Sequence, residues 1–231
     1  MESEIVKKKI VIGLPGNNFS SKFLVSWTST LNTLWETGKY DVVVSPGVSS
    51  YVPFARMQTL GLSNLRGIDQ KAFNDMPFDI FVTIDSDMVF TAQNLIDLIE
   101  ATNENDVVSG YYRMSDLKNL AIVKDWNIAH FKSTGTFKYL QSDDIAEYSK
   151  DKYLKVAYCG MGFMALTKNA IDSLSYPYFY TELQEFKGTD GKLIREMCSE
   201  DVSFCRNLTK AGFDINILTN LRIGHEKSLI I

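Results

Sequence analysis

Short apolar runs alternate with amphipathic segments over the first hundred residues of the chain. The runs at 9–14, 41–44 and 80–84 are rich in apolar and β-branched residues, and each stops at turn-forming or polar residues, as buried strands do. Between and after them, apolar residues recur at helical spacing in three segments, at 19–35, 54–65 and 92–99. This βαβαβα order predicts a parallel sheet covered by helices. Gly38 is expected to end the first helix and Thr91 to cap the third.

From residue 106 the pattern becomes less regular. Strands are expected at 106–112, 154–159, 160–166 and 215–218, and helices after Thr167 and Ser199. Other segments predict short or surface structure: antiparallel pieces at 121–123, 128–131 and 136–140, a surface helix or loop at 141–152 and a polar loop at 182–192.

Composition and charge narrow the class of protein. The 231 residues suffice for one sizeable core, so a single domain is expected, and 45% hydrophobic with 23% charged residues is ordinary globular composition. A net charge of −4 gives no basic footprint for nucleic acid or an anionic membrane.

The same survey predicts a cytoplasmic setting. Cys159, Cys198 and Cys205 are odd in number and lack CxxC spacing, which favours reduced thiols over disulfides or a zinc site. No apolar run approaches the length of a membrane span, and residues 1–4 do not open a secretory signal.

The strand at 80–84 ends in Asp85-Ser86-Asp87. Ligands of open α/β sheets bind at the carboxyl ends of the strands, and two carboxylates there suit Mg²⁺ or Mn²⁺. A solvated turn is the alternative, because Asp-x-Asp is common. The sequence contains neither GxGxxG nor GxxxxGK[ST], so a dinucleotide fingerprint and a P-loop are unsupported.

Three further fragments carry candidate chemistry. Glu200 and Asp201 open a helix, where they either favour the helix dipole or supply a catalytic carboxylate. The glycines of Gly160-Met161-Gly162 indicate close approach of the backbone, either to a ligand or to another strand. His225 is one of two histidines and is either a metal ligand or structural.

Taken in order, these fragments resemble the metal-dependent glycosyltransferases of the GT-A fold, especially inverting enzymes of family 2. The sequence is most similar to the compact glycosyltransferase domains of large algal viruses and phages, a relation that would place it in a host cytoplasm. The resemblance implies an α/β fold in one domain over 1–231, with a Rossmann-like nucleotide-binding half at 1–110 and a mixed-sheet, acceptor-binding and catalytic half at 111–231. It is carried by Leu14-Pro15-Gly16, Asp85-Ser86-Asp87-Met88, Gly160-Met161-Gly162-Phe163, Ser199-Glu200-Asp201-Val202-Ser203-Phe204-Cys205 and Gly224-His225-Glu226-Lys227.

The resemblance assigns roles to the acidic residues. Asp87 would be the main ligand of a Mn²⁺ or Mg²⁺ ion, and His225 would complete its site. Asp85 would contact the metal directly, contact it through water, or bind the ribose. Asp201 would be the general base of an inverting transfer, and Glu200 would orient the acceptor or hold the loop.

The resemblance also locates the nucleotide. Pro15 and Gly16 would lie beneath the base and ribose, and Arg56 near the pyrophosphate, although a surface arginine is the alternative for Arg56. Ser45 stands where many family 2 enzymes have an acidic residue, so the nucleotide stays open, with a UDP-linked donor expected. Trp126 would offer a flat face to a sugar in the acceptor pocket.

The expected activity is transfer of a sugar from a nucleoside-diphosphate sugar to a hydroxyl of a glycan or other acceptor. Gly160, Met161 and Gly162 would contact the substrate. One alternative is a non-catalytic nucleotide- or carbohydrate-binding module of the same descent. A sugar-phosphate nucleotidyltransferase is a further alternative, but the loop after Leu14 has no basic residue until Lys22, which counts against it.

Overall fold

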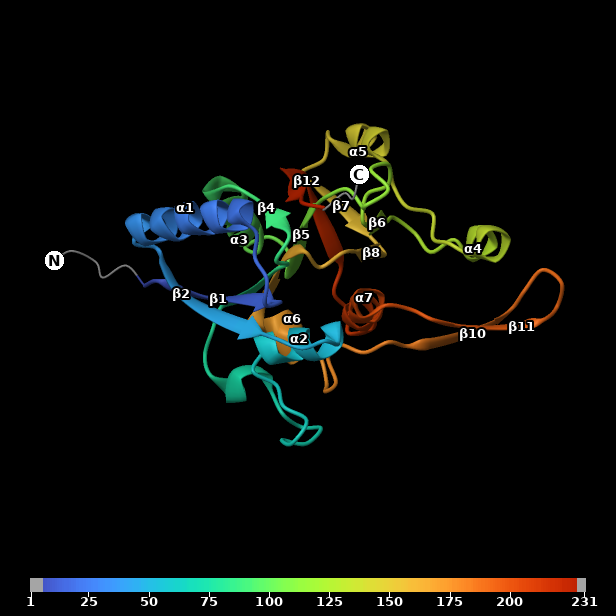
Figure 1. The fold of residues 1–231 in the computed structure, drawn as a ribbon, viewed down its shortest axis with the longest axis horizontal. Helices are drawn as coiled ribbons and strands as arrows, with labels where there is room; N and C mark the ends of the chain where they lie inside the picture. Colours follow the sequence, from blue (N-terminus) through green and yellow to red (C-terminus); the bar gives the residue numbers. More distant parts are fainter. Residues whose placement is uncertain (1–5, 228–231) are drawn as a thin grey trace.

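A seven-stranded mixed sheet runs through the computed structural model, in the order β2-β1-β3-β9-β5-β12-β7 (Figure 1). β1, β2 and β3 are parallel, as predicted, and β9 lies antiparallel between β3 and β5. The sheet strands are β1 (Lys8–Pro15), β2 (Tyr40–Gly47), β3 (Ile80–Ile84), β5 (Val107–Tyr111), β7 (Tyr153–Val156), β9 (Phe163–Thr167) and β12 (Ile215–Arg222). The structure describes residues 6–227, so the expectation about residues 1–4 lies outside the described part.

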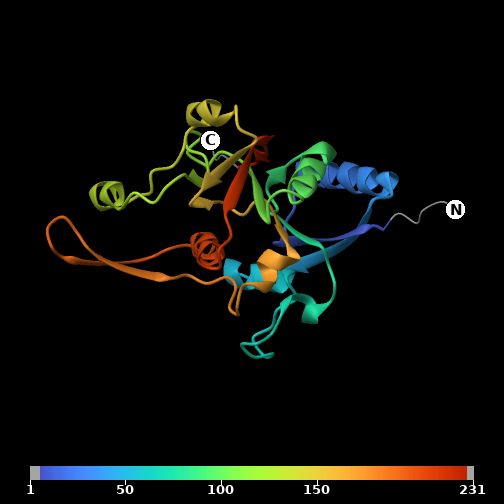
Figure 2. The same cartoon turned by 180° about the vertical axis from the view of Figure 1, so that it is seen from behind.

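Helices cover both faces of this sheet (Figures 1 and 2). Alternate residues of β1 separate the two cores: Ile10 and Ile12 pack with α1 and α3, whereas Val11 packs with α2, α6 and α7. The helices of the first face are α1 (Ser21–Thr37) and α3 (Ala92–Ala101). Those of the second face are α2 (Val52–Thr59), α6 (Lys168–Asp172) and α7 (Glu200–Lys210).

Local capping fixes where several helices begin and end. Gly38 adopts the left-handed conformation, with a φ of 65°, and donates its N–H to the carbonyl of Trp35. Thr91 and Asn94 form a reciprocal capping box at the start of α3. Thr167 accepts from the N–H of Ala170 at the start of α6. The predicted ends at Gly38, Thr91 and Thr167 are therefore confirmed.

Smaller elements surround the sheet. Two short strand pairs lie at its edge, and a long hairpin extends away from it (Figures 1 and 2). The pairs are β4 (Met88–Val89) with β13 (Gly224–His225) and β6 (Ile122–Val123) with β8 (Tyr158–Cys159), and the hairpin is β10 (Leu183–Lys187) with β11 (Leu193–Met197). The remaining helices are η1 (Ala72–Asp75), α4 (Ile128–Thr134) and α5 (Ser142–Tyr148).

Three predicted elements were wrong. The helix expected at 54–65 ends at Thr59, because Gly61 turns into the left-handed region with a φ of 63°. The strand expected at 128–131 is helix α4, whose first turn is capped by the Asn127 side chain. Residues 136–140, all described, form no strand.

The polar loop expected at 182–192 is also wrong. Residues 183–187 and 193–197 pair as antiparallel strands, and Gly191 supplies a positive φ of 78° in the turn. Gln184 and Phe186 point to one face of this hairpin, whereas Leu183 and Leu193 lie on its exposed face. The alternation is hidden in the sequence by the many polar residues.

The three cysteines carry free thiols, as predicted, and all three are buried. Within residues 6–227, no helix combines the length and the apolar character that crossing a membrane requires.

Close packing between β2 and α2 gives a testable prediction. A Cβ at Gly47 would overlap the carbonyl oxygen of Ala55, which belongs to the helix backbone and cannot rotate away. We expect Gly47→Ala to lower the free energy of unfolding by about 1–3 kcal/mol, because overpacking displaces the helix. Urea denaturation would measure this. Ser45→Ala on the same strand is the control, and an equal loss in both variants would contradict the packing argument.

Candidate active site

The ends of the first three strands meet, as the sequence predicts. The N–H of Gly16 donates to the carbonyl of Gly47 at 2.8 Å, joining the end of β1 to the end of β2. Gly16 has a φ of 128°, and a Cβ there would lie 3.2 Å from Ser86 Oγ. Pro15 is buried directly before this turn, and Ser45 is half-buried on β2. The strand-end residues therefore form one continuous edge, at which only glycine fits the position of Gly16.

The strand pair β4–β13 brings His225 to Asp87. The N–H of Glu226 donates to the carbonyl of Asp87 at 2.8 Å, and His225 pairs with Met88 in register. As a result, His225 Nε2 lies 3.1 Å from Asp87 Oδ2, and His225 Nδ1 lies 2.6 Å from the carbonyl oxygen of Arg113.

These two contacts restrict where the imidazole of His225 can carry its protons. A carbonyl oxygen only accepts, so Nδ1 carries the proton that faces Arg113. In the neutral ring, Nε2 then directs a lone pair at the carboxylate of Asp87, and two acceptors face each other. Either a second proton or a cation must lie between them. A histidine that donates its other N–H to a backbone carbonyl is the usual arrangement of a metal ligand.

Asp87 is held as a carboxylate. Lys227 Nζ lies 2.5 Å from Asp87 Oδ2, beside the imidazole. Partial burial alone would raise the pKa of Asp87, but hydrogen bonds and charges from His225 and Lys227 lower this pKa to about 2. Within the described residues, no group of three His, Cys, Asp or Glu side chains surrounds a common point. Asp87 and His225 together offer a divalent cation two protein ligands, so a cation bound here would need its other ligands from water or substrate oxygens.

Asp85 faces Arg56 and not the Asp87–His225 pair. The guanidinium binds both oxygens of Asp85, with Nη1–Oδ1 at 3.0 Å and Nη2–Oδ2 at 3.2 Å. Its Nε donates to Glu200 Oε1 at 3.2 Å, and the Arg56 side chain is 7% exposed. Burial alone would lower the pKa of Arg56, but the charges of Asp85, Glu200 and Asp201 raise it, so the guanidinium stays charged. Arg56 thus joins the end of β3 to the first turn of α7.

Asp201 lies in this same first turn of α7, and three donors hold its carboxylate. Its Oδ2 accepts from the hydroxyl of Tyr158 at 2.8 Å. Its Oδ1 accepts from the N–H of Val202 at 2.8 Å and from the hydroxyl of Ser199. Ser199 precedes the helix, as predicted, but its hydroxyl bonds the carboxylate of Asp201. Both carboxylate oxygens are therefore fixed in direction.

Two buried tyrosines support these groups. Burial and the charge of Asp201 raise the pKa of Tyr158 well above its usual value, so its phenol keeps the proton that it donates. The hydroxyl of Tyr112 accepts from the N–H of Gly162 at 3.0 Å, and the ring meets the His225 ring edge-on at 4.9 Å. Cβ atoms at Gly160 and Gly162 would overlap Tyr112.

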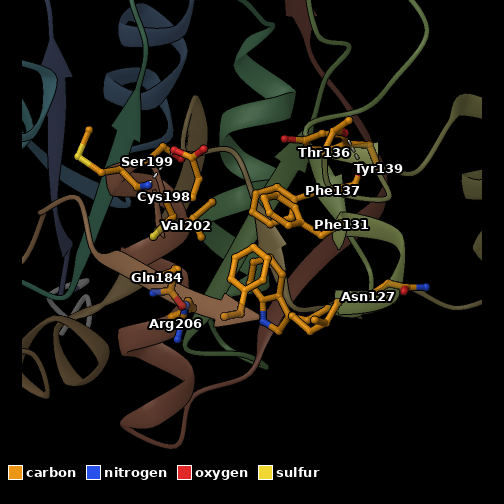
Figure 3. Close-up of a pocket in the computed structure, with 16 residues that line it drawn as sticks. Asn127, Phe131, Thr136, Phe137, Tyr139, Gln184, Cys198, Ser199, Val202 and Arg206 are labelled. Carbon is orange, nitrogen blue, oxygen red and sulfur yellow. Dashed lines mark hydrogen bonds between the residues drawn. The ribbon is translucent and has the colours of Figure 1, made fainter. Parts of the chain in front are cut away.

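The turn at 160–162 therefore packs against Tyr112, which accounts for both glycines. Met161 is buried in the core at 1% exposure. Trp126 lies near Tyr158, with the two ring centroids 6.5 Å apart. Trp126 forms part of a cavity of about 500 Å³ whose wall includes Ser199 (Figure 3).

Sequence reasoning missed several groups that the structure brings to the site. Tyr112 and Tyr158 resemble ordinary core aromatics in the sequence. Lys227 stands two positions after His225, and this alternate spacing along an extended segment was the one available signal.

No family model matches the sequence, and no curated protein matches it. Solved structures do match. The A197 protein from STIV shares 16% identity at a TM-score of 0.53, with 96% of this chain and 86% of that chain covered. GalNAc-T7, a GT-A glycosyltransferase solved with UDP, GalNAc and Mn²⁺, shares 11% identity at a TM-score of 0.50. That match covers 97% of this chain and 44% of GalNAc-T7. The chain has the GT-A fold. In this GT-A fold the carboxylates lie at the strand ends and at the start of α7.

The Arg56 bridge gives a second prediction. We expect Arg56→Ala to lower the free energy of unfolding by about 2–4 kcal/mol, because it leaves two partly buried carboxylates without their cation. The control is Arg195→Ala, which removes an exposed pair with Glu185 and should change stability by less than about 1 kcal/mol. Denaturation of both variants measures the difference. Equal effects would show that the Arg56 bridge contributes no more than a surface pair.

Proposed function

We propose that this chain is a metal-dependent, inverting glycosyltransferase of the family 2 type. It transfers a sugar from a nucleoside-diphosphate sugar, UDP-linked in our proposal, to a hydroxyl of a glycan or other acceptor. The observation that carries the proposal is the Asp87–His225 pair, a carboxylate oxygen and an imidazole nitrogen held 3.1 Å apart at the strand ends of a GT-A fold. The free cysteines fit a reducing compartment such as the cytoplasm.

Asp87 and His225 would hold Mn²⁺ or Mg²⁺. When bound, the ion stabilises the negative charge that develops on the diphosphate leaving group. Lys227 places a further positive charge beside Asp87, which favours an anionic diphosphate at this edge. The presence of UDP and Mn²⁺ in the GalNAc-T7 structure supports this choice of donor and metal.

The nucleoside would lie on the edge formed by Pro15, Gly16 and Ser45. Gly16 presents backbone without a side chain there, so a ring can approach closely. In this proposal Arg56 is a positioning residue, which its two ion pairs with carboxylates of the protein itself support. Asp85 is then a partner of Arg56, within reach of a ribose hydroxyl or a metal-bound water.

Asp201 would act as the general base. It takes the proton of the acceptor hydroxyl while that oxygen attacks the anomeric carbon, and the bond to the diphosphate oxygen breaks on the opposite face. The nucleoside diphosphate leaves with the bonding electron pair. Tyr158 and Ser199 hold the carboxylate in one orientation, and Glu200 holds the first turn of α7 through Arg56.

Turnover tests the activity. The full chain with Mn²⁺ and a panel of nucleotide sugars should release nucleoside diphosphate, faster when an acceptor is present. Asp87→Ala and Asp201→Asn should each reduce the rate, by about 10²–10⁴-fold for the base. Release that both variants leave unchanged would contradict the proposal. Tight nucleotide binding without turnover on a broad acceptor panel would favour a non-catalytic binding module.

The two acidic sites should differ in nucleotide binding. Asp201→Asn removes a base without touching the diphosphate, so we expect its affinity for UDP with Mn²⁺ to remain within about twofold of the parent. Asp87→Ala should weaken that binding by roughly tenfold or more, because it removes a metal ligand. Titration calorimetry with and without Mn²⁺ measures both. If Asp201→Asn loses as much affinity as Asp87→Ala, the separation of roles is wrong.

A further inference from the structure

A cavity of about 500 Å³ lies between α4, the β10–β11 hairpin and the start of α7 (Figure 3). This size is within the range of small-molecule sites. Phe131 and Phe137 line one wall, and the Phe131 ring meets that of Phe186 from β10 edge-on at 5.5 Å. Cys198 and Ser199 close one end, as Figure 3 shows.

That end of the cavity adjoins Asp201. Ser199, part of the wall, donates its hydroxyl to the Asp201 carboxylate. Trp126, also part of the wall, lies 6.5 Å between ring centroids from Tyr158, which is the other side-chain donor to Asp201. Two independent contacts therefore connect the cavity to the carboxylate proposed as the base.

Several polar side chains of the wall already have one partner within the protein. Asn127 and Glu196 accept from backbone N–H groups at 2.8 and 2.9 Å. Thr136 donates to a backbone carbonyl at 3.0 Å, and Arg206 pairs with Glu182 at 3.5 Å. A sugar ring buried here would give up hydrogen bonds to water, and it would compete with these existing partners for part of its replacements.

The surface that remains available is apolar. Trp126 is 38% exposed and Ile128 58% exposed, although both line the cavity. The aromatic rings pack on one another with centroids 5.3 Å apart for Trp126–Phe137 and for Phe131–Phe137. Covering this surface with a flat or extended apolar group removes it from water and adds ring contacts.

We propose that the cavity binds the apolar aglycone of the acceptor: an aryl or alkyl group attached to the moiety whose hydroxyl reaches Asp201. This inference rests on the proposed function and specifies its acceptor class as a hydrophobic glycoside or a lipid-linked or aryl-linked saccharide. The reacting hydroxyl stays at the polar end beside Ser199, and the apolar group lies among Trp126, Phe131 and Phe186.

Saturation-transfer NMR tests the proposal without any donor or turnover. The full chain is mixed separately with phenyl β-D-glucopyranoside, octyl β-D-glucopyranoside and free glucose. We expect strong transfer to the phenyl or octyl protons, weak transfer to the sugar protons, and little signal from glucose. The aglycone with the stronger transfer distinguishes an aryl from an alkyl source.

Variants with matched controls locate the binding. Ile128→Asp puts a carboxylate into the cavity wall and should weaken glycoside binding by about tenfold or more, because the charge is desolvated without a partner. Ala129→Asp, on the same helix outside the wall, should leave binding unchanged. Phe186→Ala should also weaken binding, whereas Leu193→Ala on the exposed face of the same hairpin should not.

Three outcomes would overturn the proposal: transfer to glucose equal to that of the glycosides, equal binding in Ile128→Asp and Ala129→Asp, or absence of transfer to all three probes. Because no nucleotide is present, these outcomes are independent of nucleoside diphosphate release. Failure of the aglycone site can therefore be told apart from failure of the glycosyltransferase proposal.

Discussion

Arg56 carries its charge buried between two carboxylates that come from opposite halves of the chain. Asp85 directly follows the strand β3, and Glu200 begins the helix α7, 115 positions later. None of these three charges is stable there alone, since an unpaired charge out of water is costly. The bridge therefore fixes how far the strand-end carboxylates stand from Asp201. The separation of the Asp87–His225 pair from Asp201 therefore depends on one side chain that hydrogen-bonds neither of them.

A second constraint comes from the end of the chain. The strand β13 pairs with β4, which brings His225 next to Asp87 although more than a hundred residues separate them in the sequence. Tyr112 then packs between the His225 ring and the turn at 160–162. The β4–β13 strand pair and the Tyr112 side chain thus hold together segments that are distant in the sequence. Both glycines of that turn are explained by the ring and require no ligand.

The sequence predicted those parts of the structure that local chemistry determines. The pattern of apolar residues predicted β1, β2 and β3, and the capping residues Gly38 and Thr91 predicted the end of α1 and the start of α3. Because parallel strands end at a common edge, the meeting of the ends of β1, β2 and β3 also followed. The sequence did not predict that Arg56 is the partner of Asp85, because this pairing depends on how separate elements pack together. The β10–β11 hairpin was missed for a similar reason. Its strands consist mostly of polar residues, so which side chains face inward becomes clear only once the pairing of the two strands is known.

The surroundings of Asp201 explain why the neighbouring cavity matters for the chemistry. Tyr158, Ser199 and its own helix backbone occupy both carboxylate oxygens from fixed directions. A carboxylate held this firmly cannot rotate to meet an acceptor, so the acceptor hydroxyl has to be brought to it. In the proposed reaction the nucleotide would occupy the strand-end edge, so the acceptor would be positioned from the other side of Asp201. The surface there is largely aromatic, and apolar contact would supply binding without competing for the hydrogen bonds that hold the Asp201 carboxylate.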